Sequence, residues 1–185
     1  EGELELDLND DNNISEDIKE LTSDEKIKNI KENLSSVGLI YTDYQVRRQV
    51  PLQHIMNILS SLIEKEPIGR NINQNKIAEY SEIPNIEFSS IIHNLEVVNK
   101  ILNELYSKYD DLIFWRNTTC YFSLTFMIYF NLDKIISVDY LVKVLKNFEK
   151  SDYFNEFKRL TQERGNDKVT RVKRNKMLEE ALLSV

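Results

Sequence analysis

With 185 residues, 41% of them hydrophobic, the chain can bury one sizeable core, and a single domain is expected. The four glycines and three prolines are too few for a turn-rich all-β fold and favour long helices. The formal net charge of −7 argues against general nucleic-acid binding unless the charge is unevenly distributed.

The N-terminal end is predicted to be an acidic arm over residues 1–20. Residues 1–17 carry eight acidic side chains and no basic one. Leu4, Leu6 and Leu8 alternate with carboxylates, which is the period of a short half-exposed strand, before residues 9–13 break the pattern. An edge strand and a disordered arm both fit this pattern. Residues 21–185 are then expected to form a single helical domain.

Two helices are predicted in the first part of that domain. The capping-box pattern Thr22-Ser23-Asp24-Glu25 indicates a helix from about Ser23 to Ser35. Pro51 suits the first turn of a second helix, which Pro67 and Gly69 should end. Its apolar residues recur at helical spacing and are Leu52, Ile55, Met56, Leu59, Leu62 and Ile63.

A short helix over 73–81 and a long amphipathic helix after Pro84 come next. The long helix shows the clearest periodicity in the chain. Its apolar positions are Phe88, Ile91, Ile92, Leu95, Val98, Leu102, Leu105 and Tyr109.

The stretch from Ile113 to Phe130 is apolar almost all round, whereas every other periodic segment is one-sided. A helix without a polar face must be wrapped by other helices. The sequence therefore predicts an all-α, multi-helix bundle around a buried central helix at about 117–130. The run from Cys120 to Phe130 is too short to span a membrane, which needs roughly 20 residues, and no membrane partner is expected.

Three further helices should complete the bundle. Ser137 can cap the first, tyrosine and phenylalanine residues between 153 and 160 mark the second, and the third covers 169–183. A single cysteine excludes an intrachain disulfide, so a cytoplasmic location is expected. The sequence around Glu1 has no secretory signal and suggests a piece of a longer protein.

The search for catalytic chemistry is negative. His54 and His93 are far apart and lack a second ligand at metal-binding spacing. Cys120 lies in an apolar run that should raise its pKa and keep it inert. Asp110 and Asp111 are neighbours, which suits a loop better than a general acid–base pair. We expect no enzyme activity of this chain itself, no cofactor and no metal.

A helix-turn-helix over residues 75–95 is an alternative function. The spacing of apolar residues fits two helices joined by a turn. However, Glu82 stands where the turn usually has glycine, and the second helix offers Glu87, Ser89 and Ser90 without a nearby arginine or lysine. A carboxylate at that place repels DNA.

The C-terminal end is basic, in contrast to the arm. Such a segment could bind phosphates or an acidic partner, or it could be the solvated face of two helices, with the arm pairing this end. The candidate contact residues here are Arg164, Lys168, Arg171, Lys173, Arg174 and Lys176.

Several segments in order resemble the helical C-terminal part of GmrSD-type restriction and anti-phage proteins. They are Leu39 to Arg48, Trp115-Arg116, Tyr121 to Leu124 and, more loosely, Arg171 to Leu178, so that the resemblance spans about residues 36–183. In that family the helical part follows a ParB-like N-terminal domain with an Asp-Gly-Gln-Gln-Arg motif. That motif and any His-Asn-His-like motif are absent here, so no catalytic residue can be carried over.

The resemblance implies a non-catalytic accessory domain that positions an NTPase or nuclease domain. Arg47 and Arg48 would contact the missing N-terminal domain, and the basic end would contact DNA or a partner subunit. The open alternatives are the helix-turn-helix regulator and a protein–protein interaction module that uses the acidic arm. The oligomeric state is not determined by the sequence.

Overall fold

The computed structural model of the chain describes residues 40–41, 50–69, 80, 84–135, 137–162 and 167–184. These residues form helices and no strand, which confirms the predicted all-α bundle. The acidic arm, the helix expected over 23–35 and, apart from Tyr80, the helix expected over 73–81 lie outside the described residues.

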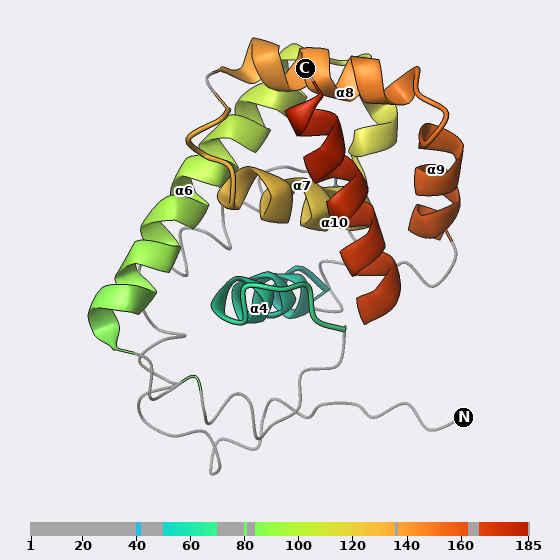
Figure 1. Ribbon diagram of the computed structural model, residues 1–185. Coiled ribbons are helices and arrows are strands. Elements are labelled where there is room, and N and C mark those ends of the chain that lie inside the picture. Colours follow the sequence, from blue (N-terminus) through green and yellow to red (C-terminus); the bar gives the residue numbers. More distant parts are fainter. Residues whose placement is uncertain are drawn as a thin grey trace.

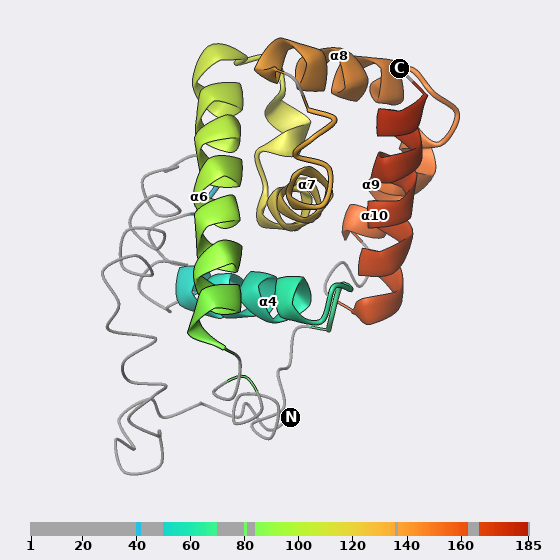
Figure 2. The ribbon, with the colours of Figure 1, turned by 60° about the vertical axis from the view of Figure 1, so that its left-hand side comes forward.

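Helix α7 (Thr118–Tyr129) is the centre of the bundle, as the sequence predicts. Its residues from Cys120 to Ile128 are all buried. Figure 2 views α7 nearly along its axis, with α6, α8, α10 and α4 around it, and Figure 1 shows it from the side. The surrounding helices are α4 (Val50–Ile63), α6 (Asn85–Lys108), α8 (Val138–Glu149), α9 (Phe154–Gln162) and α10 (Lys168–Leu183).

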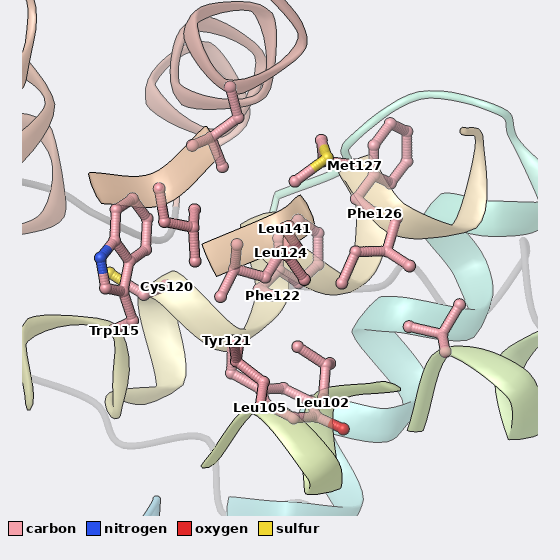
Figure 3. Packing of buried hydrophobic residues seen from close by; sticks show 14 of the residues in the cluster. Leu102, Leu105, Trp115, Cys120, Tyr121, Phe122, Leu124, Phe126, Met127 and Leu141 are labelled. Atoms are coloured by element: carbon pink, nitrogen blue, oxygen red, sulfur yellow. The ribbon is translucent and has the colours of Figure 1, made fainter. Parts of the chain in front are cut away.

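Hydrophobic side chains fill the space between α7 and its neighbours. In Figure 3, Tyr121 of α7 lies beside Leu102 and Leu105 of α6, and Leu124 lies beside Leu141 of α8. The hydroxyl of Tyr121 donates a hydrogen bond of 2.7 Å to Oδ1 of the buried Asn99. The aromatic surface of α7 is thus buried without leaving its phenol group unpaired.

The apolar block does not form one continuous helix. Ile113–Trp115 is a short 3₁₀ turn, η1, and α7 starts only after Asn117, whose side chain accepts a 2.9 Å hydrogen bond from the amide of Cys120. This asparagine interrupts the block because it supplies the N-cap that the first turn of α7 requires.

The η1 turn fastens the end of α6 to α8. Trp115 is 0% exposed, and its indole N–H donates a 2.7 Å hydrogen bond to Glu149. The guanidinium of Arg116 donates to the carbonyl oxygens of Tyr106 and Tyr109, where α6 ends. Such carbonyls have no partner within their own helix, so Arg116 stabilises the C-terminus of α6.

The remaining predicted boundaries agree closely with the structure. The long helix after Pro84 is α6, and Ser137 caps α8 by accepting a 3.1 Å hydrogen bond from the amide of Tyr140. Of the helices described, none combines the length and hydrophobicity that crossing a bilayer would require.

Helix α4 ends earlier than expected, at Ile63 rather than at Pro67. Lys65 has a φ of 56°, in the left-handed region. The amide of Lys65 donates a hydrogen bond to the carbonyl of Leu62, and the amide of Glu66 donates one to the carbonyl of Ser61. These two hydrogen bonds define a Schellman motif. Glycine usually occupies the left-handed position because it has no Cβ to strain the backbone.

We therefore expect Lys65→Gly to raise the free energy of unfolding by up to about 1 kcal/mol, as measured by urea denaturation. The matched control is Lys100→Gly at an exposed position inside α6, which should lower it by about 1 kcal/mol. If both variants lose stability alike, the left-handed conformation of Lys65 is not what ends α4.

Candidate interaction surface

Helix α10 divides the predicted basic end into a buried row and an exposed row. Asp167 caps the helix by accepting a 2.8 Å hydrogen bond from the amide of Thr170. The buried residues are Arg171, Arg174, Asn175, Met177, Leu178 and Leu182. Because a helix repeats every three to four residues, two of the predicted contact arginines fall on the side that faces α7.

Arg171 is 2% exposed and points toward α4. Its guanidinium donates a 2.6 Å hydrogen bond to the carbonyl of Ile68 and a 3.3 Å one to Oδ1 of Asn57. It also lies 4.1 Å from the ring centre of Phe122 on α7. This cation–π contact and the two hydrogen bonds join α10 to α4 and α7.

Arg174 is 0% exposed and points toward α7 and α9. Its guanidinium donates a 2.9 Å hydrogen bond to the carbonyl of Leu160 and a 3.2 Å one to the hydroxyl of Ser123. Burial lowers the pKa of Arg174 to about 10, so the group still carries its charge at neutral pH.

These positions correct the expectation that Arg171 and Arg174 contact DNA or a partner. Their guanidinium groups are enclosed by the bundle, and their hydrogen bonds go to its own carbonyl and side-chain oxygens. The physical reason is that three-carbon stems let arginine cross a helix interface while its planar head reaches fixed acceptors.

The exposed row of α10 carries the three other predicted contact residues that the structure describes. Lys168 pairs with Glu66 at 2.6 Å, Lys173 pairs with Glu156 at 2.7 Å, and Lys176 lies 4.0 Å from Glu180. All three ion pairs are solvent-exposed, and such pairs contribute only about 0–1 kcal/mol each. The bundle therefore loses little stability when one of these lysines leaves its present carboxylate for a carboxylate of a partner.

Two valines lie in the same row, and the sequence analysis did not single them out. Val169 is 76% exposed and Val172 is 41% exposed. The signal was available, because positions 168, 169, 172, 173 and 176 share one side of a helix. We call Lys168, Val169, Val172, Lys173 and Lys176 together the α10 outer face.

Glu156 of α9 borders this face and is shared by two cations. Arg159 and Lys173 both donate hydrogen bonds to its carboxylate. These bonds lower the pKa of Glu156 to about 2, and the bond from Arg159 has the larger effect. Glu156 would thus remain paired with Arg159 if Lys173 formed an ion pair with a different carboxylate. Arg47, Arg48 and Arg164, the other predicted contacts, lie outside the described residues.

His54 of α4 lies in a small aromatic cluster rather than beside a second ligand. Its Nδ1 and the hydroxyl of Tyr41 are joined by a 2.6 Å hydrogen bond, and its ring stacks on Phe122 at 6.2 Å between centres. Burial, and next the charge of Arg171, lower the pKa of His54 to about 3. The imidazole is therefore neutral at physiological pH.

Cys120, Asp110 and Asp111 have partners within the bundle. Burial raises the pKa of Cys120 to about 12, as expected from its apolar surroundings. Asp110 pairs with Arg116 and Asp111 with Lys146, so the two neighbours diverge. Within the described ranges, no three His, Cys, Asp or Glu side chains gather closely enough to hold a metal ion.

The helix-turn-helix alternative is only partly visible, since 70–79 and 81–83 lie outside the described residues. The second helix of that motif is the start of α6, where Glu87, Ser89 and Ser90 are exposed and Ile91 and Ile92 are buried. The exposed side in this part of α6 is thus polar and acidic, without a described cation beside Glu87 to contact phosphate.

Comparison with known proteins adds no relative. Neither the protein-family models, nor the curated proteins, nor the solved structures contain a match to this chain.

Proposed function

We propose that this chain is a non-catalytic helical interaction domain whose α10 outer face docks an acidic partner. The observation that carries the proposal is the arrangement of this face. Val169 and Val172 are solvent-exposed between Lys168, Lys173 and Lys176, while the buried arginines of α10 bind carbonyl oxygens inside the bundle. Exposed apolar side chains ringed by charges are typical of protein-binding sites.

The partner we propose is the N-terminal domain or a partner subunit of a bacterial DNA-restriction or anti-phage protein. This part of the proposal rests on the resemblance to GmrSD-type proteins. In support of this proposal, the described residues form a packed bundle, and the described groups with strongly shifted pKa values, such as His54 and Cys120, are engaged inside it. The partner would supply the catalytic groups.

The test is site-specific photo-crosslinking in cells that express the protein from its native gene. A photoreactive phenylalanine derivative at Val172 should give a discrete protein adduct, and Lys173→Glu with Lys176→Glu should abolish it. The same derivative at Lys100, exposed on α6 across the bundle, is the control. Equal adducts at both positions, or none at Val172, would refute docking on this face. An adduct with a protein that lacks an acidic surface would refute the proposed partner chemistry.

Duplex DNA should not compete for this face. The formal net charge of the chain is −7, and residues 1–17 alone contribute eight acidic groups, so the chain as a whole repels a polyanion. We expect no saturable binding of the whole chain to a fluorescent duplex at low salt, measured by anisotropy. Binding that weakens with salt and disappears in a Lys168→Glu, Lys173→Glu, Lys176→Glu variant would instead identify a nucleic-acid surface.

Deleting α10 would not be a usable control in either experiment. The helix contributes Arg174, Leu178 and Leu182 to the interior, so its removal would expose the core of the bundle. Charge reversal at exposed lysines changes the surface without disturbing this packing.

A further inference from the structure

We infer that two copies of this chain pair through antiparallel α10 helices, and that this pairing covers the α10 outer face until an acidic partner replaces the second copy. The pairing is carried by the described residues of α10 alone. Its regulatory consequence, in which the second copy and the partner compete for the same valines, rests on the proposed function.

The exposed side of α10 continues past the α10 outer face to the C-terminal end of the helix. Leu183 is 69% exposed there, compared with 41% for Val172. At about 3.6 residues per turn, positions 169, 172, 173, 176, 180 and 183 fall within a strip about 100° wide. In Figure 1 this helix crosses the front of the bundle, and no other described helix lies in front of it. Helix α10 thus presents one continuous strip with exposed apolar side chains in both halves.

The charges along this side of α10 change sign from one end to the other. Lys168, Lys173 and Lys176 come first, and Glu179 and Glu180 follow. A helix dipole favours the reverse order, with acidic residues in the first turn and basic residues in the last, and α10 has neither. The stability of the helix therefore does not account for this order. The order does suit a second α10 that runs in the opposite direction, because each lysine half then faces a glutamate half.

One antiparallel register satisfies both the apolar and the charged residues. When Val172 lies level with Leu183 of the second copy, Lys176 lies level with Glu179 of that copy. Lys173 and Glu180 of the second copy then lie on the same side of the contact, about two residues apart in level. Each contact occurs twice, because a two-fold axis relates the copies. A parallel arrangement would instead set lysines against lysines.

Pairing requires no rearrangement of the bundle. Lys173 is paired with Glu156, which remains bound by Arg159 when the lysine turns to the second copy. The exposed pair of Lys176 and Glu180, at 4.0 Å, contributes little and is equally easy to exchange. One helix per copy buries less than the about 1,600 Å² typical of stable complexes. The dimer is therefore weak enough for an acidic partner to displace the second copy.

The first test follows the molar mass of the purified full chain by sedimentation equilibrium over a range of concentrations. We expect a monomer–dimer equilibrium. Lys173→Glu and Glu180→Lys should each raise the dissociation constant of the dimer about fivefold or more, because each sets like charges side by side. The variant with both changes should return to within about twofold of the unmodified chain. Positions 173 and 180 are too far apart to pair within one helix, so this rescue reports contact between copies.

The second test reports the direction of the helices through disulfide formation under mild oxidation. Cys120 is buried and its pKa is raised to about 12, so the engineered cysteines are the reactive ones. A mixture of Val172→Cys and Leu183→Cys chains should form the mixed disulfide roughly tenfold faster than Val172→Cys forms a disulfide with itself. In the antiparallel register the two positions 172 lie about 16 Å apart along the helices, which a disulfide cannot span.

A chain that stays monomeric, charge variants that do not rescue each other, or a Val172→Cys self-disulfide that forms as fast as the mixed one would each overturn the inference. The proposed function fails separately. A monomeric chain that still gives a partner adduct at Val172 would retain the docking face and reject the pairing. A dimer that meets both tests, combined with an adduct of Val172 to a second copy alone, would retain the pairing and reject the acidic partner.

Discussion

Replacing Arg174 with alanine is expected to lower the free energy of unfolding by about 3 kcal/mol or more. The substitution leaves a cavity at a fully buried position and removes the donors to the carbonyl of Leu160 and the hydroxyl of Ser123. Buried acceptors that lose their donors keep the full cost of desolvation. Urea denaturation followed by circular dichroism measures the change.

Two further variants separate the causes of that loss. Arg174→Met keeps most of the volume and removes both the charge and the donors, so it should cost less than alanine. Lys176→Ala, an exposed neighbour on the same helix, should change stability by no more than about 0.5 kcal/mol. Equal effects of Arg174→Ala and Lys176→Ala would show that the guanidinium of Arg174 does not lie inside the bundle.

Acid should destabilise the protein through His54. Its pKa is lowered to about 3 in the folded chain, against 6.5 for a histidine exposed to water. Between these two pH values the unfolded chain binds a proton that the folded chain excludes, so stability rises with pH across this window and is fully present above 6.5. As pH falls below 6.5, stability should drop by up to about 1.4 kcal/mol per unit.

His54→Gln should flatten this part of the pH profile, because glutamine does not titrate. Nuclear magnetic resonance can follow the two histidine rings directly, since the chain has only two. An imidazole of His54 that titrates near pH 6.5 would contradict its placement against Tyr41 and Phe122.

The helices themselves were largely predictable from the sequence. The apolar periodicity of α6 and the all-round hydrophobicity of α7 are strong signals, because each reflects how many sides of a helix are buried. The start of α7 was also predictable, since the polar run from Arg116 to Thr119 precedes the apolar residues and the predicted range of about 117–130 agrees with Thr118–Tyr129. The early end of α4 depends on the left-handed backbone conformation of Lys65. A lysine gives no sequence signal for this conformation, whereas a glycine would have done so.

The candidate surface was only half predictable. A count of charges does not distinguish arginine from lysine. On that count the whole of α10 was predicted to be one exposed basic segment. Spacing alone could have separated them, because Arg171 and Arg174 fall in line with Leu178 and Leu182 at helical intervals. What spacing could not supply was the reason an arginine is tolerated inside, namely the fixed oxygens of Ile68 and Leu160 from distant parts of the chain.

The hydrophobic surface of α7 has a consequence for how the protein is made. During synthesis α7 leaves the ribosome after α4 and α6, which can cover only part of it, whereas α8 and α10 are still to come. Helix α10 begins about 40 residues after the end of α7, a delay of roughly 2–8 s at 5–20 residues per second. Throughout that interval the side of α7 that α10 covers in the folded protein has no partner, so we expect the nascent chain to be prone to aggregation until α10 is made.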